Sequence, residues 1–248
     1  MTFTIVARDP AEGLYGIAMA TSSPAVGNRC SFVYPSGALA FQSVAEPRLG
    51  ALGLRLLAFG YSAQKVCDEL LSTDPGRELR QIGIVDADGR TTAYTGTENL
   101  LWAGHVMGQG FVAMGNVLAG EEVVEAIAEE YQASGAYAFE DRLVRAVGGG
   151  RDAGGQEEGQ CSASLLTFGR DEFSRCDLRV DLSDEPVAEL RRLYDFYAPL
   201  VPYYVDRARN HKIGRYKDFL KRNGHTRTFG PRPPVTRGPK TIGRPPDR

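Results

Sequence analysis

The stretch TFTIVARDPAEGLYGIAMAT, residues 2–21, decides the fold of this chain. Its two ends, residues 2–8 and 14–21, are rich in apolar and β-branched side chains, which favour extended strands. Pro10 and Gly13, which lie between them, are residues that commonly form turns. The stretch therefore predicts an antiparallel hairpin at the start of the chain.

Apolar periodicity predicts further strands and paired helices after this hairpin. The predicted strands are residues 37–44, 79–86, 91–95, 104–115 and 162–168. The predicted helices are residues 48–58, a helix that begins after Ser62 and ends at Asp74, and residues 117–131, 139–147 and 187–209. Hairpin-linked strands and helices in pairs indicate an α+β protein with antiparallel sheets, not an alternating β-α-β fold.

The composition is that of a globular protein and argues against several classes of function. Of the 248 residues, 42% are hydrophobic and 24% are charged. The net charge of −2 gives no electrostatic footprint for nucleic acid, so no nucleic-acid partner is expected. No apolar run approaches about 20 residues, so we expect no membrane-spanning helix. The first residues lack a basic segment followed by a cleavable apolar stretch, so we expect no signal peptide.

The cysteines and histidines indicate a protein without a metal or a disulfide framework. The four cysteines are scattered and form no CxxC pair, which predicts a reducing, cytoplasmic location: Cys30, Cys67, Cys161 and Cys176. Two of the three histidines, His211 and His225, lie in a basic C-terminal segment, so His105 is the remaining partner for a catalytic Cys or Ser. This scarcity argues against a zinc site and against a Ser-His-Asp triad. We expect no cofactor and no metal.

Changes of composition predict three parts of the chain. Residues 1–182 contain the predicted strands and paired helices, and residues 183–211 form a C-terminal helical extension. Residues 212–248 are basic and, towards their end, rich in Pro, Gly and Arg with few large apolar side chains. Such a segment cannot bury a core, so we expect it to be disordered. Its roles could be to solubilise the protein or to wrap a subunit, and a nucleic-acid or membrane-surface role is the alternative.

Thr2 is a candidate nucleophile. Methionine aminopeptidases generally remove Met1 before a small residue, which would leave Thr2 at the mouth of the first strand. An N-terminal threonine carries a hydroxyl nucleophile and, on the same residue, an amine that can act as its base. The pKa of an α-amine, about 7.7–8.0, suits that task near neutral pH. The alternative is that Met1-Thr2 is an ordinary chain start without catalytic meaning.

Two loops are further candidates. Residues 21–27, TSSPAVG, follow a predicted strand and could face the Thr2 strand, or could simply form a turn braced by hydroxyls. Residues 148–162, GGGRDAGGQEEGQCS, predict a glycine-rich loop that could approach a ligand closely, or a plain surface loop. The second loop does not match a nucleotide-binding P-loop. A Cys161–His105 pair is a minor alternative for catalysis.

Several ordered motifs together resemble one family. They are TFTIVARDP, GIAMATSSPAVGNRCS, QSVAEPRLG, RQIGIVDADGRTTAYTG, GNVLAG and GGQEEGQCSASLL. In this order they resemble the domain of unknown function 1028 family, a branch of the Ntn-hydrolase-like proteins. A C-terminal stretch, CDLRVDLSDEPVAELRRLYDFYAPLVPYYVDRA, looks like the extension of one subgroup, so the resemblance covers about residues 2–209.

The resemblance implies a fold and an activity. The implied fold is a four-layer αββα sandwich, in which two antiparallel sheets pack face to face between helix layers. The implied activity is hydrolysis of an amide bond in a small molecule or short peptide, with the Thr2 hydroxyl as nucleophile and its amine as base. The implied oxyanion or substrate-binding candidates are Ser22, Ser23, Asn28, Gln42, Asn116, Cys161 and Ser162. A homo-oligomer, dimeric or larger, is also implied.

Departures from the family pattern keep alternatives open. A proteasome-like site needs a lysine near its nucleophile, and the only lysine before the basic segment is Lys65, in a predicted surface helix. In the family's usual glycine-rich motif, Gln156 stands in place of an acid, Glu158 in place of an arginine and Cys161 in place of a glutamine. The alternatives are a catalytically inactive relative that binds a small ligand, and an interaction protein that acts through its basic segment.

Overall fold

The computed structural model describes residues 1–225, in which ten strands form two antiparallel sheets. The larger sheet has the order β10-β9-β2-β1-β8-β7 and the smaller one the order β3-β4-β5-β6. The strands are β1 (Thr2–Asp9), β2 (Leu14–Thr21), β3 (Ser31–Tyr34), β4 (Gly37–Ser43), β5 (Arg80–Asp86), β6 (Thr91–Thr95), β7 (Trp102–Gly108), β8 (Phe111–Leu118), β9 (Ser162–Phe168) and β10 (Ser174–Val180). The predicted hairpin is confirmed as β1 and β2, which pair from Thr2↔Thr21 to Asp9↔Leu14.

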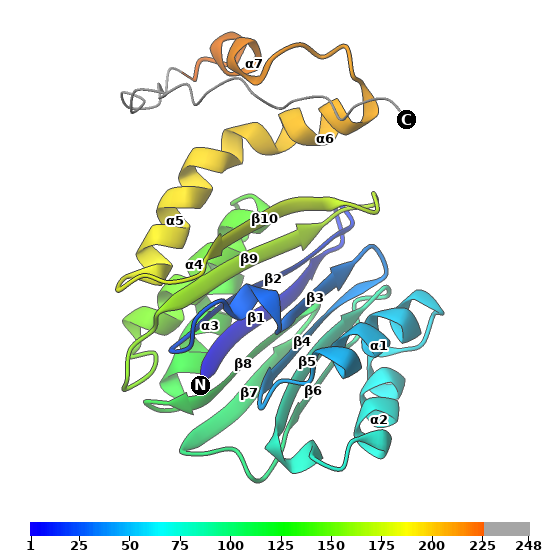
Figure 1. Cartoon of the computed structure of the whole chain (residues 1–248), viewed down its shortest axis with the longest axis vertical. Helices are drawn as coiled ribbons and strands as arrows, with labels where there is room; N and C mark the ends of the chain where they lie inside the picture. The colour runs from blue at the N-terminus through cyan, green and yellow to red at the C-terminus, as the bar shows by residue number, and fades with distance from the viewer. Residues whose placement is uncertain (226–248) are drawn as a thin grey trace, which may run out of the picture.

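Two helix pairs cover the outer faces of the sheets (Figure 1). The helices are α1 (Pro47–Ala58), α2 (Ala63–Thr73), α3 (Glu122–Ala133), α4 (Phe139–Asp152), α5 (Pro186–Tyr197), α6 (Val201–Arg209) and α7 (Tyr216–Arg222). α3 and α4 pack on the larger sheet, and α1 and α2 pack on the smaller one. The molecule is thus an α+β, four-layer αββα sandwich, which confirms the expected fold class.

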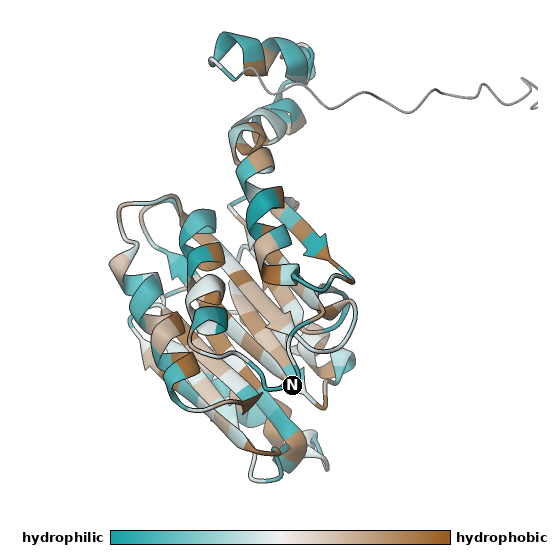
Figure 2. Cartoon of the chain, turned by 90° about the vertical axis from the view of Figure 1, so that its left-hand side faces the viewer, coloured by the Kyte–Doolittle hydropathy of each residue, from teal (hydrophilic) through white to brown (hydrophobic). Residues whose placement is uncertain are grey.

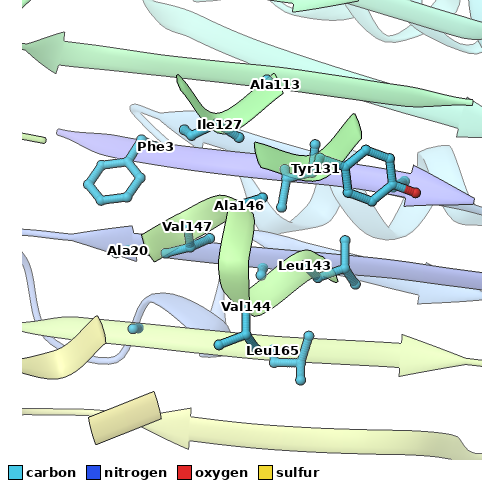
Figure 3. Packing of buried hydrophobic residues seen from close by; sticks show 14 of the residues in the cluster. Phe3, Ala20, Ala113, Ile127, Tyr131, Leu143, Val144, Ala146, Val147 and Leu165 are labelled. Atoms are coloured by element: carbon cyan, nitrogen blue, oxygen red, sulfur yellow. The ribbon is translucent and has the colours of Figure 1, made fainter. Parts of the chain in front are cut away.

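Side-chain alternation along the central strand β1 builds two of the three core layers. Phe3 and Ile5 face α3 and α4, where Ile127 and Val147 meet them (Figure 3). Val6, on the opposite face of β1, joins the apolar layer between the two sheets. A third layer fills the space between the smaller sheet and α1 and α2. This alternation means that even-numbered residues of β1 point between the sheets.

Local signals explain where α1 and α2 begin. Pro47 occupies the first turn of α1, where its missing N–H costs nothing, and the Glu46 side chain accepts from the Arg48 amide. Ser62 Oγ accepts from the Lys65 amide, which confirms the predicted N-cap of α2. Both helices therefore begin close to where the sequence indicates.

The structure corrects three predicted elements. Residues 104–115, predicted as one strand, instead contribute to two strands, β7 and β8, because Gly110 adopts a positive φ of 73° in a tight turn. β8 continues to Leu118, so the helix predicted from residue 117 begins only at Glu122. Residues 148–150, predicted as loop, belong to α4. Gly150 lets α4 pack closely against α3, since a Cβ on residue 150 would lie 2.6 Å from the Ile127 side chain of α3.

The C-terminal part is more structured than predicted. The helix predicted over residues 187–209 is interrupted by the short turn Ala198–Leu200, which separates α5 from α6. α5 packs on α4 and the β9–β10 edge, and α6 and α7 lie beyond that edge (Figures 1 and 2). α7 forms inside the basic segment that was expected to be disordered, because Leu220 buries an apolar side chain there. Residues 226–248 lie outside the described residues. Within residues 1–225, no helix is long and apolar enough to cross a membrane.

Candidate active site

Thr2 lies at the first position of the central strand, where three strand ends meet. It pairs with Thr21 of β2 on one side and with Asn116 of β8 on the other. Only 5% of its surface is exposed. Because β1 is hydrogen-bonded on both sides, the backbone of Thr2 is held rigidly at one end of the sandwich.

The hydroxyl of Thr2 lies beside a second hydroxyl. Thr2 Oγ1 is 3.2 Å from Thr21 Oγ1 and donates to the Met1 carbonyl oxygen at 2.6 Å. The Thr21 hydroxyl donates to the same Met1 oxygen. The Thr21 hydroxyl of β2 therefore donates to an oxygen atom, that of the Met1 carbonyl, which lies next to Thr2 Oγ1. Thr21 is the first residue of the candidate segment 21–27, and the β1–β2 register places it directly opposite Thr2.

Buried amides support the backbone of Thr2 from the second sheet. Gln42 Nε2 of β4 donates to the Thr2 carbonyl at 3.3 Å and to Gln81 Oε1 at 2.8 Å. Thr4 Oγ1 donates to Gln42 Oε1 at 2.5 Å. Asn116 Nδ2 also donates to Gln81 Oε1, at 3.0 Å, while Asn116 Oδ1 has no partner within residues 1–225. The two sheets are thus joined near Thr2 by neutral polar groups.

Gln81 of β5 is the centre of this network, and sequence reasoning did not identify it. Its amide nitrogen lies within hydrogen-bond distance of the carbonyls of Gly104 and Gly115 and of Thr95 Oγ1. Thr95 Oγ1 lies 3.0 Å from His105 Nδ1, and burial lowers the pKa of His105. A continuous set of hydrogen bonds therefore leads from the Thr2 carbonyl to the edge of the larger sheet.

A cavity of about 540 Å³ lies next to this end of β1. Its lining residues are Ser22, Arg151, Glu158, Gly159, Gln160, Cys161, Ser183, Asp184, Glu185, Pro186 and Val187. Ser22 Oγ lies 3.5 Å from Met1 Sδ, which places the Met1 side chain beside the cavity wall. Cys161 Sγ donates to the Ser22 carbonyl at 3.1 Å. The cavity and the Thr2 hydroxyl are therefore separated by Met1 and the Thr21–Ser22 segment.

The amine at the chain start lies in a desolvated position. Burial lowers the pKa of the Met1 ammonium, although Cys30 and Glu158 act in the opposite direction. Burial also raises the pKa of the Cys30 thiol to about 11, so this neighbour is neutral at physiological pH. An amine in this environment is neutral at a lower pH than an exposed one.

The remaining candidates do not gather around Thr2. Ser162 Oγ donates to the Ser23 carbonyl at 2.7 Å and accepts from the Val26 amide at 3.1 Å. Ser23 Oγ accepts from Arg29 at 2.6 Å, and Asn28 is exposed on the same turn. These side chains brace the turn after β2. Among the candidates, the structure brings Gln42, Asn116 and Ser22 to the Met1–Thr2 end.

The departures from the family motif have structural consequences. Lys65 is exposed on α2 and pairs with Glu69 at 2.8 Å, so it is engaged away from Thr2. Gln156 is 3% exposed, and neither polar atom of its side chain has a partner within residues 1–225. In the same described part of the chain, no group of three or more His, Cys, Asp or Glu residues could hold a metal ion.

Comparison with known proteins identifies relatives of the whole sandwich. Residues 2–190 match the family of unknown function DUF1028. The chain is also similar to the crystal structure of protein SPO2555 from Silicibacter pomeroyi, which carries the same family assignment. The two chains are 32% identical with a TM-score of 0.73, over 79% of this chain and 88% of that one. No curated protein matches the chain.

Proposed function

This chain belongs to the family of unknown function DUF1028, and we propose that it is an N-terminal-nucleophile amidohydrolase that uses Thr2. One observation carries the proposal. The Thr2 hydroxyl lies at the end of a central strand, 3.2 Å from the Thr21 hydroxyl. Met1 and the Thr21–Ser22 segment separate it from a cavity of about 540 Å³, so removal of Met1 would open the hydroxyl towards that cavity. The activity requires that Met1 be removed, since a peptide bond to Met1 would block the Thr2 amine.

The proposed reaction splits amide hydrolysis into two steps. Thr2 Oγ1 adds to the substrate carbonyl carbon while the Thr2 amine takes the hydroxyl proton. That proton then passes to the leaving amine as the C–N bond breaks, which leaves an ester on Thr2. Water attacks the ester carbonyl with the same amine as base, releases the carboxylic acid and restores the hydroxyl.

Neighbouring groups fit the roles that this reaction needs. The Thr21 hydroxyl, which donates to the Met1 carbonyl oxygen, is the candidate donor for the developing oxyanion. Gln42 holds the Thr2 carbonyl and thereby fixes the orientation of the nucleophile. Asn116 pairs in register with Thr2, and its Oδ1, which has no partner within residues 1–225, is a candidate acceptor for the Thr2 amine.

Desolvation supports an active amine in the absence of a nearby lysine. The Met1 ammonium already has its pKa lowered, with burial as the largest cause. The Thr2 amine would lie one residue further into the sandwich, so burial should act on it as well. A lowered pKa leaves a larger fraction of the amine neutral at pH 7, as a general base requires.

The charges that line the cavity support a proposal for the class of substrate. Among residues 1–225, its carboxylates, Glu158, Asp184 and Glu185, outnumber its one guanidinium. That guanidinium, Arg151, is bound to Asp152 at 2.7 Å. A small amide or short peptide that carries an ammonium group or no charge should therefore bind better than an anionic one.

Intact mass and covalent labelling test the proposal. We expect protein expressed without an N-terminal tag to lack the mass of one methionine. A β-lactone, which acylates reactive hydroxyls, should then add one equivalent to the N-terminal peptide. Thr2→Ala should remove the adduct and all turnover of a panel of small amides and dipeptides while keeping the circular dichroism spectrum.

Two controls sharpen this experiment. Thr97→Ala removes an exposed threonine hydroxyl bound to Glu78 and should leave the adduct unchanged. A retained Met1, or an adduct on Thr2→Ala at the wild-type level, would overturn the Thr2 mechanism. A protein that binds ligands in the cavity but never acylates would instead be the inactive, ligand-binding relative.

Two finer parts of the proposal need separate measurements. We propose a homo-oligomer, on the resemblance alone, which sedimentation of the untagged protein tests directly. We also propose a cytoplasmic location. All four cysteines are free in the structure, which suits a reducing compartment, and fractionation of the source cells tests it.

A further inference from the structure

A second cavity, of about 360 Å³, lies at the opposite end of β1 from Thr2. Its lining residues are Arg8, Pro10, Asp88, Gly89, Gln109, Gly110, Tyr131 and Arg142. Three hairpin turns and the α3–α4 pair converge there. Since a strand rises by about 3.3 Å per residue, Arg8 lies about 20 Å along β1 from Thr2. Figure 3 shows Phe3 and Tyr131 towards opposite ends of the labelled cluster.

We infer that this cavity binds a small molecule through a phosphate or carboxylate group, held by the guanidinium groups of Arg8 and Arg142. Arginine side chains recognise such oxyanions with paired, charge-assisted hydrogen bonds. The inference concerns a site separate from Thr2 and does not depend on the proposed hydrolase activity.

The charge of the two arginines is not neutralised within the described chain. Among residues 1–225, neither Arg8 nor Arg142 forms an ion pair, whereas the cavity's one lining carboxylate, Asp88, is bound to Arg90 at 2.7 Å. The nearby Asp9 caps its own turn by accepting from the Ala11 amide at 2.8 Å. Two positive charges therefore face the cavity without a dedicated counter-ion.

One hydrogen-bond donor of Arg142 is buried and lacks an acceptor in the described part of the chain. Its Nε is buried and has no hydrogen-bond partner within residues 1–225. The guanidinium carbon lies 4.2 Å from the centre of the Tyr131 ring, and Nη2 makes a long contact of 3.4 Å with the Tyr131 carbonyl. A buried unpaired donor is costly, so its persistence points to an acceptor that residues 1–225 do not supply.

Other residues around the cavity position Arg8, and Tyr131 adds a hydroxyl donor. Arg8 Nε donates to the Tyr15 hydroxyl at 3.3 Å, and its guanidinium passes over Gly89, where a Cβ would lie 3.1 Å from Nη1. Tyr131 is 3% exposed, and burial raises its pKa to about 12, so its hydroxyl stays protonated at neutral pH. A cavity of about 300–1,000 Å³ with a few converging polar groups is typical of small-molecule sites.

Calorimetric titration of the full chain tests the inference with two probes, inorganic phosphate and succinate, at ionic strength fixed by sodium chloride. We expect saturable binding of at least one probe. Arg142→Gln and Arg8→Gln should each weaken it by about tenfold or more, since each removes charge-assisted hydrogen bonds. Gln109→Glu adds a negative charge at the exposed rim of the cavity with a side chain of the same shape, and it should weaken binding too.

Arg55→Gln is the matched control, because Arg55 is exposed on α1 and lines neither cavity. It should keep the wild-type affinity. Binding of phosphate alone assigns the site to phosphate esters, and binding of succinate alone assigns it to carboxylates. No saturable binding of either probe by the wild type, or unchanged binding by Gln109→Glu and the folded Arg8→Gln/Arg142→Gln double variant, would overturn the inference.

Discussion

The two ends of β1 lie near cavities of opposite charge. Within residues 1–225, the carboxylates of Glu158, Asp184 and Glu185 outnumber the guanidinium groups near Thr2, whereas at the other end Arg8 and Arg142, which form no ion pair in that part of the chain, dominate. The polar groups inside the sandwich differ as well. Those near Thr2 are neutral hydroxyls and amides, which keep one protonation state across a wide pH range. One strand thus carries a network of oriented, mostly neutral groups at one end and a charge-dependent region at the other.

Stability should be more sensitive to a single substitution in the neutral network near Thr2 than at the other end of β1. Gln81→Leu leaves Gln42 Nε2 and Asn116 Nδ2 without their shared acceptor and removes one donor to the Gly115 carbonyl. Each buried group left unsatisfied costs about 1–3 kcal/mol, so we expect the free energy of unfolding to fall by about 3–5 kcal/mol. Urea unfolding followed by Trp102 fluorescence measures it.

Ile82→Val is the control on the same strand, because Ile82 faces the apolar layer under α1 and α2. Removing one buried methylene there should cost about 0.5–1.5 kcal/mol. If Gln81→Leu costs no more than Ile82→Val, the amide network contributes little, and the contrast between the two ends of β1 fails.

The charged end should respond to pH instead. Asp86 at the end of β5 accepts from the Ala63 amide at 2.9 Å and from Arg90 Nε at 2.7 Å. Burial alone would raise the pKa of Asp86, but these hydrogen bonds hold it below its ordinary value. The stability that Asp86 contributes is therefore present above the unfolded-state pKa, about 3.9, and is lost as the pH falls through the lower folded-state value.

Asp86→Asn tests the direction of this pH dependence. At pH 7 the variant should be less stable by about 1.5–3 kcal/mol, because hydrogen bonds to a charged group are lost. The difference from the wild type should shrink as the pH falls below about 4, since the wild-type carboxyl becomes protonated. Urea titrations at several pH values measure it, and a difference that grows in acid would contradict the assignment.

The local sequence pattern correctly predicted those helices and strands that are marked by residues close together in the sequence. The β1–β2 hairpin has strong β-branched runs and turn formers, and the Ser62 cap precedes an apolar stripe. β10 escaped prediction because it is an edge strand, on which Arg175, Asp177 and Arg179 alternate with apolar residues. Charged side chains protect such edges from pairing with other chains, but they weaken the strand signal.

Long-range contacts decided what local pattern could not. Glycines at 148–150 indicate a loop by propensity, but α4 needs a small residue at Gly150 to pack against Ile127. Thr2 was identified as a candidate from its position and chemistry alone. Gln81 gave no local signal, because its partners Gln42 and Asn116 lie 39 and 35 residues away in sequence.

The smallest expected effect separates the two ends most cleanly. Thr4→Val keeps the shape of the side chain but removes the donor to Gln42 Oε1, which should cost about 1 kcal/mol. Because neither Thr4 nor Gln42 titrates, the loss should be the same at pH 5 and pH 9, whereas the Asp86 contribution follows the protonation of its carboxyl. A Thr4→Val loss that changed with pH would mean that the amide network is coupled to a titrating group such as His105. In that case the network near Thr2 would itself depend on pH, and the contrast with Asp86 would fail.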